Sequence, residues 1–144
     1  LMVILWNLNV AEREELLQRI CTPVNIKREL IENISSGQKT LQLFTPENSQ
    51  EFNVKIYNLL KPLNIETIIL MMIYAKEWQK KAIFNYLTRL KDIKPLITGE
   101  DLKKLGIQPG PIYRKILESI LREKLQGRLL SKEEEIEFAK KIGS

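Results

Sequence analysis

Apolar residues recur at spacings of three and four along almost the whole chain, and the strict alternation typical of strands is nearly absent. This pattern predicts an all-α fold, a helical bundle of about six to eight short helices. The expected helices cover residues 10–21, 25–35, 46–60, 64–74, 77–93 and 132–142, with two more near residues 98–105 and 111–125. Residues 1–6 form a helix or connector, and residues 38–45 a connector.

Glycine and proline mark the expected ends of these helices. Gly37 follows residues 25–35 in the manner of a C-terminal glycine, Pro62 follows residues 46–60, and Pro95 ends residues 77–93. Asn64 is positioned to cap the next helix, whose body, residues 67–74, is apolar all round. That helix is expected to be the central, fully enclosed helix of the bundle.

The side-chain inventory excludes several kinds of active site. The 144 residues include no histidine, one cysteine and two aspartates, so His-based triads, His-ligated zinc sites and Cys clusters are ruled out. Cys21 is interpreted as a small buried apolar residue, and its lone thiol fits a reducing, cytoplasmic environment. The apolar run at residues 68–75 falls far short of the roughly 20 residues that span a bilayer, so no membrane contact is expected.

The net charge of +5 is concentrated in one stretch. Residues 103–128 carry seven Lys and Arg but two Glu, and residues 76–102 add a smaller basic excess, whereas residues 1–75 and 129–144 are slightly acidic. Such a local basic surface attracts polyanions such as RNA, DNA or an anionic membrane. A solvated helical face whose lysines serve solubility is the alternative, and charge alone leaves both open.

Residues 94–128 predict a helix, a tight Gly/Pro turn and a second helix near the C-terminus. Thr98 and Asp101 have the spacing of a capping box for the first helix, and Gly106 closes it. Ile107 is then expected to fill the core, and Pro111 suits the first position of the second helix because that position needs no N–H partner. Gly127 ends the second helix, and Ser131 with Glu134 caps a last one.

The start of the second helix is a potential anion site. Backbone N–H groups and the helix dipole favour negative charge there, and basic side chains lie near the turn in sequence at Lys103, Lys104, Arg114 and Lys115. A nucleic-acid phosphate could lie against the backbone at Gly110 between these side chains. In the equally open alternative, the glycines and proline only form a sharp corner, and the basic side chains are solvated.

The same stretch resembles the C-terminal part of bacterial class II tRNA nucleotidyltransferases, the CCA-, CC- and A-adding enzymes, and the related poly(A) polymerases. The resemblance rests on residues 95–102 (PLITGEDL), 105–111 (LGIQPGP), 116–117 (IL) and 125–127 (LQG). It is best over residues 57–142 and looser over residues 1–56. Arg114 and Gln126 depart from the family pattern, where glycine and aspartate are common.

The resemblance implies an all-helical body segment over residues 1–62 and a helical tail that binds tRNA over residues 63–144. Nucleotide addition, with Mg²⁺ and ATP or CTP as cofactors, would occur in a separate N-terminal head of the same polypeptide. The chain has no Asp-x-Asp pair for two metal ions. Its acidic run, Glu133 to Glu135, is interpreted as the start of a surface helix with a structural role. No catalytic and no metal-binding residue is therefore expected here.

The expected contacts follow the basic residues, and the partner would be the tRNA elbow and acceptor arm, bound by backbone shape so that the 3′ end reaches the head. One set is expected on a single helix, at Lys80, Lys81, Arg89 and Lys94. The other lies on the turn and the helices flanking it, at Lys103, Lys104, Gly110, Arg114 and Lys115.

Two other functions fit the sequence. In the first, the bundle is a structural module that holds neighbouring domains or a second subunit. Trp6 and the apolar residues 1–5 would form its contact and could support an oligomer. The second is a stand-alone helix–turn–helix DNA binder, which has little support because the second helix lacks an Asn, Gln and Arg cluster at its N-terminus. The chain itself opens without Met or a basic leader and is interpreted as part of a longer polypeptide.

Overall fold

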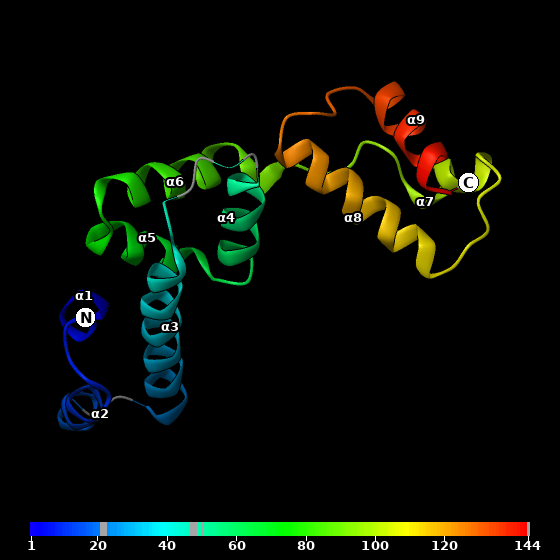
Figure 1. Ribbon diagram of the computed structural model, residues 1–144. Helices are drawn as coiled ribbons and strands as arrows, with labels where there is room; N and C mark the ends of the chain where they lie inside the picture. Colours follow the sequence, from blue (N-terminus) through cyan, green and yellow to red (C-terminus); the bar gives the residue numbers. More distant parts are fainter. Residues whose placement is uncertain (21–22, 47–48, 50, 144) are drawn as a thin grey trace. The chain divides into compact units, whose positions relative to one another are not determined.

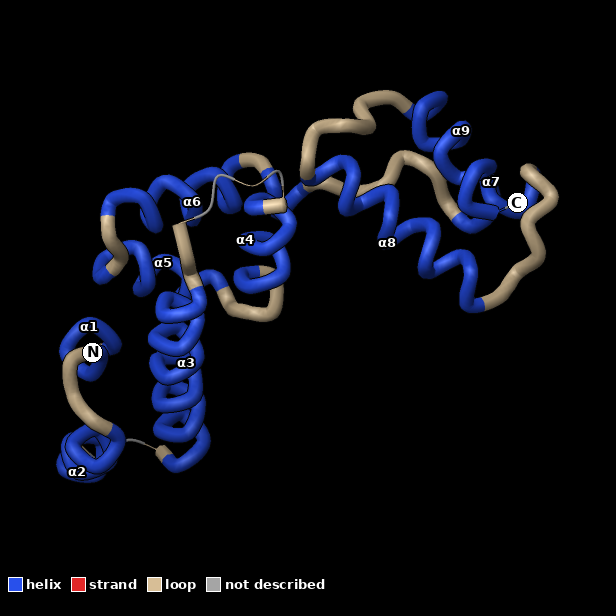
Figure 2. The backbone as a smooth tube through the Cα atoms, in the orientation of Figure 1, coloured by secondary structure: helices blue, strands red, loops and turns tan. Residues whose placement is uncertain are grey.

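The computed structural model describes residues 1–20, 23–46, 49 and 51–143, and this part of the chain contains helices and no strands (Figures 1 and 2). The all-α prediction is confirmed. The α-helices are α1 (Met2–Trp6), α2 (Val10–Arg19), α3 (Val24–Leu43), α4 (Phe52–Leu60), α5 (Ile65–Tyr74), α6 (Glu77–Thr88), α7 (Gly99–Lys104), α8 (Pro111–Leu125) and α9 (Lys132–Gly143), with a 3₁₀ turn, η1, at Leu90–Asp92. None of the described helices is long and apolar enough to cross a membrane.

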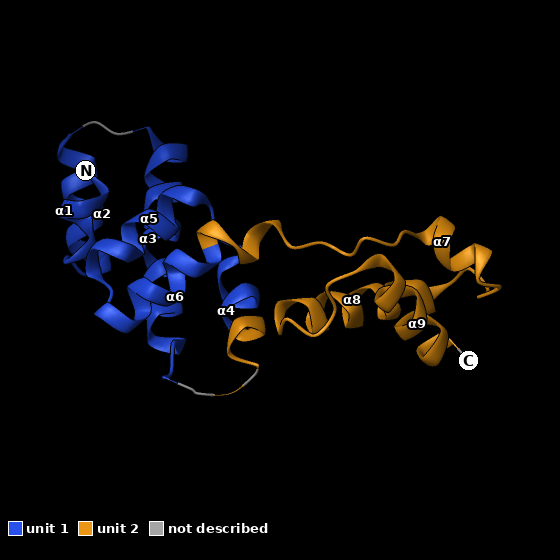
Figure 3. Cartoon of the chain, turned by 90° about the horizontal axis from the view of Figure 1, so that it is seen from above, with its two compact units in different colours: residues 1–47, 56–86 blue, residues 48–55, 87–144 orange. Residues whose placement is uncertain are grey.

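The chain divides into two compact units, coloured separately in Figure 3. Unit 1 comprises residues 1–47 and 56–86, and unit 2 comprises residues 48–55 and 87–144. This division follows packing. The expected functional division into residues 1–62 and 63–144 stays a prediction, as does the interpretation of Cys21, which lies outside the described residues.

Unit 1 is organised around the long helix α3, which packs against α1, α2 and α5. Leu5, Leu17, Ile34 and Met71 are fully buried where these helices meet. At the end of α5 the Tyr74 ring stacks on Trp6 with ring centroids 4.9 Å apart, and its hydroxyl donates to the Val3 carbonyl at 2.6 Å. α1 is therefore fixed to α5 by both apolar and polar contacts.

The prediction that the helix over residues 25–35 ends at Gly37 is wrong. α3 runs on to Leu43, so most of the expected connector at residues 38–45 is helical. A Cβ at Gly37 would lie 3.0 Å from Thr67 Cγ2 and 3.1 Å from Trp6 Cζ3. Glycine is favoured at this position because Trp6 of α1 and Thr67 of α5 approach α3 closely, and it does not mark a helix end.

Other helix predictions need correction. The helix expected from residue 46 begins at Phe52, and residues 47, 48 and 50 lie outside the described part. The helix expected over residues 77–93 stops at Thr88 and is followed by η1, which tightens the chain and buries Leu90.

The prediction that α5 is fully enclosed is also wrong. Thr67, Ile68, Leu70 and Met71 are buried, but Ile69 and Ile73 are 53% and 54% exposed. Unit 1 covers one side of this helix, whereas the apolar sequence extends around the whole of it.

Unit 2 has its own apolar core. Ile97, Leu102, Ile116, Ile120 and Ala139 are buried together, and partly buried side chains from α8, α9 and the segments that follow α7 and α8 surround them. The first part of the segment 48–60 also belongs to this unit: the Asn53 side chain donates to the Leu125 carbonyl at 3.2 Å, and Arg122 forms an ion pair with Glu51.

Candidate nucleic-acid interface

Both ends of α7 have the local structure that their residues predict. The Thr98 amide and hydroxyl donate to Asp101 at 2.8 and 2.9 Å, so the predicted capping box is present. At the other end the amides of Gly106 and Ile107 donate to the carbonyls of Lys103 and Leu102 at 2.9 and 3.2 Å. Gly106 has φ +80°, so this is a Schellman cap that favours glycine.

Tyr113 connects the turn to both helices. Its hydroxyl donates to the Ile107 carbonyl at 2.9 Å, and its ring lies against Gly99 at the start of α7. Ile107 itself packs against the unit 2 core while remaining partly exposed, as expected of a residue that fills the corner. The first turn of α8 is therefore held against the start of α7 and the turn by one side chain.

Five of the predicted contact residues flank this turn and are all exposed. Lys103 and Lys104 occupy the last turn of α7, Gly110 is the N-cap of α8, and Arg114 and Lys115 follow in its first turns. A Cβ at Gly110 would meet no atom within 4 Å, and its φ of 162° is ordinary extended backbone. Open space around Gly110 leaves room for a ligand without requiring glycine there.

Arg114 is engaged with an acid. Its Nε donates to Glu118 at 2.7 Å, which raises the pKa of the guanidinium. Because both side chains are largely exposed, water screens this pair, and it competes little with a phosphate. Arg122, four residues after Glu118, pairs with Glu51 and does not extend the row of ion pairs along α8.

The sequence predicted that the other four contact residues lie on a single helix, and this prediction is wrong. Lys80 and Lys81 are on α6 in unit 1, Arg89 follows the end of α6, and Lys94 lies beyond η1 in unit 2. Lys80 also pairs with Glu77 at 2.8 Å, which lowers the pKa of Glu77. The structure therefore groups the first five residues around the turn between α7 and α8 (residues 105–110, the α7–α8 turn). It leaves the second set of four residues dispersed.

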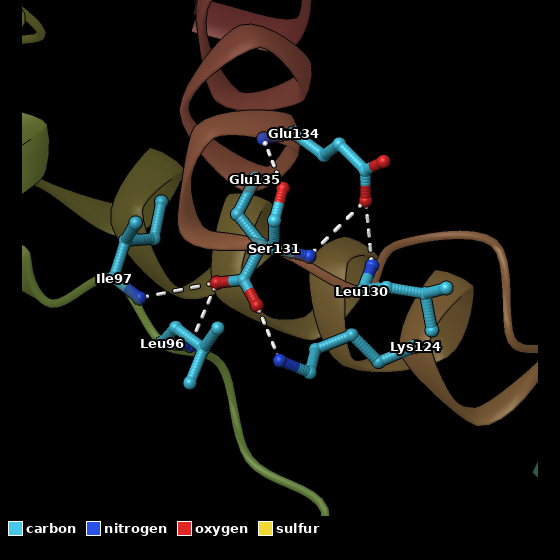
Figure 4. A network of polar contacts seen from close by, with 7 residues as sticks. All are labelled: Leu96, Ile97, Lys124, Leu130, Ser131, Glu134 and Glu135. Atoms are coloured by element: carbon cyan, nitrogen blue, oxygen red, sulfur yellow. Dashed lines mark hydrogen bonds and ion pairs between the residues drawn. The ribbon is translucent and has the colours of Figure 1, made fainter.

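The acidic run at the start of α9 has a structural role, but the prediction that it lies on the surface is wrong for Glu135. Glu135 is fully buried and accepts from the amides of Leu96 and Ile97 at 2.7 and 3.1 Å, while Lys124 of α8 contacts its other oxygen (Figure 4). One carboxylate thus joins α9, α8 and the segment before α7.

Glu134 shows how neighbouring acids can differ. It accepts from the amides of Leu130 and Ser131 at 2.6 and 3.1 Å, and these bonds lower its pKa (Figure 4).

The burial of Glu135 was not predicted from the sequence, although the sequence contains a signal for it. Glu135 lies four residues before the buried Ala139, within the apolar stripe of α9.

Comparison with known proteins places the chain in a family. Residues 1–139 match the family of tRNA nucleotidyltransferase domain 2. The chain belongs to this family. It is 29% identical over 128 residues to the A-adding tRNA nucleotidyltransferase of Geobacter sulfurreducens, covering 86% of this chain and 14% of that protein.

A second relative, the A-adding tRNA nucleotidyltransferase of Halalkalibacterium halodurans, is 26% identical over 117 residues, covering 81% of this chain and 26% of that protein. The chain therefore matches a minor part of each tRNA nucleotidyltransferase. No solved structure gives a significant match. The family match covers the α7–α8 turn and every one of the nine predicted contact residues.

The described residues also bear on where the metal chemistry of such an enzyme could occur. Within residues 1–20, 23–46, 49 and 51–143, no three His, Cys, Asp or Glu side chains are grouped to hold a metal ion. The most buried carboxylate, Glu135, is occupied by two amides and Lys124. This part of the chain does not fit the two-metal site that nucleotide addition requires.

Proposed function

We propose that this chain is the non-catalytic part of a tRNA nucleotidyltransferase or poly(A) polymerase, which binds the tRNA backbone and positions the 3′ end. Catalysis, with Mg²⁺ and ATP or CTP, would take place in a separate N-terminal domain of the same polypeptide. The family match supports the tRNA substrate, and the run of exposed cations around the α7–α8 turn is the observation that carries the binding role.

The mode of binding follows from the side chains available. Lysine and arginine neutralise phosphates without reading bases, and structured RNA presents shape and 2′-hydroxyls more readily than base edges. Lys103 and Lys104 enter from the last turn of α7, whereas Arg114 and Lys115 enter from the start of α8. Two cationic groups on either side of a rigid turn suit two successive phosphates of one strand.

The test is binding of the chain to tRNA and to an unstructured RNA of equal length over a salt series. We expect tighter binding to tRNA, with a log–log salt slope of about 0.7–0.9 per phosphate contact. Lys103→Glu with Lys104→Glu should weaken binding and lower the slope by about 1 per lysine.

The matched control is Lys140→Glu with Lys141→Glu. This pair also consists of adjacent exposed lysines in the last turn of a helix of unit 2, so net charge and helix-dipole effects change equally. Equal loss in both double variants would reduce the effect to net charge. Unchanged affinity of the Lys103 and Lys104 variant would remove the turn as the binding site.

A second function, an interaction module, has one observation in its favour. Val3 and Ile4 of α1 and Ile69 and Ile73 of α5 are about half exposed or more. Trp6, expected in this contact, is instead buried against Tyr74, so deleting residues 1–6 would also damage the core. Ile4→Glu is the cleaner variant, and loss of self-association in sedimentation measurements would support this function.

A further inference from the structure

Arg13 is a buried cation, and no carboxylate among the described residues pairs with it. It is 2% exposed, on α2 in unit 1, and its Nε donates to the Leu5 carbonyl at 2.8 Å. Its Nη2 donates to the Trp6 carbonyl at 3.1 Å and to Gln38 Oε1 at 2.9 Å. These acceptors are neutral, so the partial negative charge of the C-terminal end of α1 offsets the guanidinium only in part.

An open cavity of about 600 Å³ lies beside this guanidinium, with walls from α1, α2, α3 and the residues that join α1 to α2. Arg13 and Lys39 line it, and none of the described residues in its wall is acidic. Its neutral polar lining consists of Asn7, Asn9, Ser35, Gln38 and Gln42. Two cations among uncharged donors make an environment suited to an anion.

The hydrogen bonding leaves capacity for a ligand. Nη1 of Arg13 reaches only Ser35 Oγ, at 3.5 Å, whereas the other guanidinium nitrogens have shorter bonds. The two acids adjacent to Arg13 in sequence, Glu12 and Glu14, line other hollows, and Glu12 is bonded to the Asn9 amide at 2.8 Å. An anion in the cavity would therefore meet the least satisfied edge of Arg13 without meeting a lining carboxylate.

We propose that this cavity in unit 1 binds a phosphate group, carried either by a mononucleotide or by an RNA backbone. Planar guanidinium and mobile ammonium groups together hold phosphate oxygens well, and amides complete the set. The volume lies within the roughly 300–1,000 Å³ of small-molecule sites, and Leu8 and Val10 supply apolar wall. The site is distinct from the α7–α8 turn and does not depend on the function proposed for it.

The experiment is an amide and guanidinium NMR titration of the whole chain with inorganic phosphate, AMP and a short single-stranded oligoribonucleotide, in chloride buffer. Shifts are expected in Asn7, Asn9, Lys39 and the Nε–H of Arg13. Saturation by AMP or phosphate identifies a free phosphate source, and saturation by the oligonucleotide alone identifies an RNA backbone.

Lys39→Glu should weaken binding about tenfold because it reverses one of the two cations of the wall. Arg28→Glu is the matched control. Arg28 is also exposed and on α3, about 16 Å along the helix from Lys39. It should leave the affinity within about twofold. The proposal is overturned if no probe shifts these residues, if the shifts centre on residues 103–115, or if Arg28→Glu weakens binding equally.

Discussion

Among the described residues, each unit buries one charged side chain, and the two charges are stabilised in different ways. In unit 1 the Arg13 guanidinium is bonded to backbone carbonyls and an amide, without an opposite charge. In unit 2 the Glu135 carboxylate is bonded to two backbone amides and also to Lys124, whose side chain is 11% exposed. A fully compensated charge serves packing alone, whereas an uncompensated one beside a cavity leaves binding capacity.

The two units also differ in the kind of side chain that they expose. Unit 2 exposes lysines before and after the turn between α7 and α8, and unit 1 exposes apolar residues of α1 and α5. Variants that remove one buried charge at a time test whether each has the role assigned to it.

The largest effect is expected for Glu135→Gln. Removing one partner of a buried pair leaves Lys124 without its counter-charge and weakens the bonds to Leu96 and Ile97, which should cost about 3 kcal/mol. Hydrogen exchange of the α8 and α9 amides measures this change. Glu133→Gln, on the same helix but exposed, should stay within about 0.5 kcal/mol. An equally small effect at Glu135 would contradict the tie between the three segments.

Arg13→Met should cost about 2 kcal/mol in unit 1, since the apolar stem remains but the Leu5 and Trp6 carbonyls lose their charged donor and keep only the Leu8 amide and the Gln38 side chain. Both tryptophans of the chain, Trp6 and Trp78, belong to unit 1, so fluorescence during denaturant unfolding reports on this unit. The control is Arg19→Met on the same helix, whose pair with Glu15 is exposed. Similar unfolding curves for both variants would show that burial of Arg13 adds nothing.

Gly37→Val should cost about 1–2 kcal/mol because Trp6 and Thr67 leave no room for a branched side chain. Ser36→Val places the same side chain one position away, where the residue is exposed. The difference between the two variants isolates close approach from helix propensity. Equal effects of the two variants would contradict the close approach of Trp6 and Thr67 to Gly37.

The smallest effect concerns pH. Bonds from the Thr98 amide, then Lys132 and the Thr98 hydroxyl, lower the pKa of Asp101 from 3.8 to about 2. The unfolded chain therefore binds this proton first as the pH falls, so the contribution is complete above about pH 4 and is lost toward pH 2. Asp101→Asn should flatten the dependence of the stability of unit 2 on pH over this window, which denaturant unfolding at a series of pH values measures.

Local features of the fold were predictable. The capping pairs Thr98 with Asp101 and Ser131 with Glu134, Pro111 at the first position of α8, and Gly106 after α7 all appear where their chemistry predicts them. Each depends on hydrogen bonds or dihedral angles within about four residues, which the sequence alone contains.

Features that depend on partners distant in the sequence could not be predicted. Gly37 faces a residue 30 positions away, Glu135 bonds amides 38 and 39 positions away, and Arg13 bonds Gln38 25 positions away. The same holds for the exposed face of α5, because an apolar helix does not reveal which of its sides is covered. The basic residues around the α7–α8 turn were foreseen as a group since the turn is local, but the set at Lys80 to Lys94 was dispersed by the end of α6.

The sequence by itself thus determined the helical class, the capped ends, the basic turn and the resemblance to the family that residues 1–139 match. Tertiary structure decided which charges are buried, which glycine is a contact and where a cavity opens beside Arg13. The physical reason is range: periodicity and capping act over one or two turns, whereas burial and charge compensation depend on segments that meet only when the chain folds.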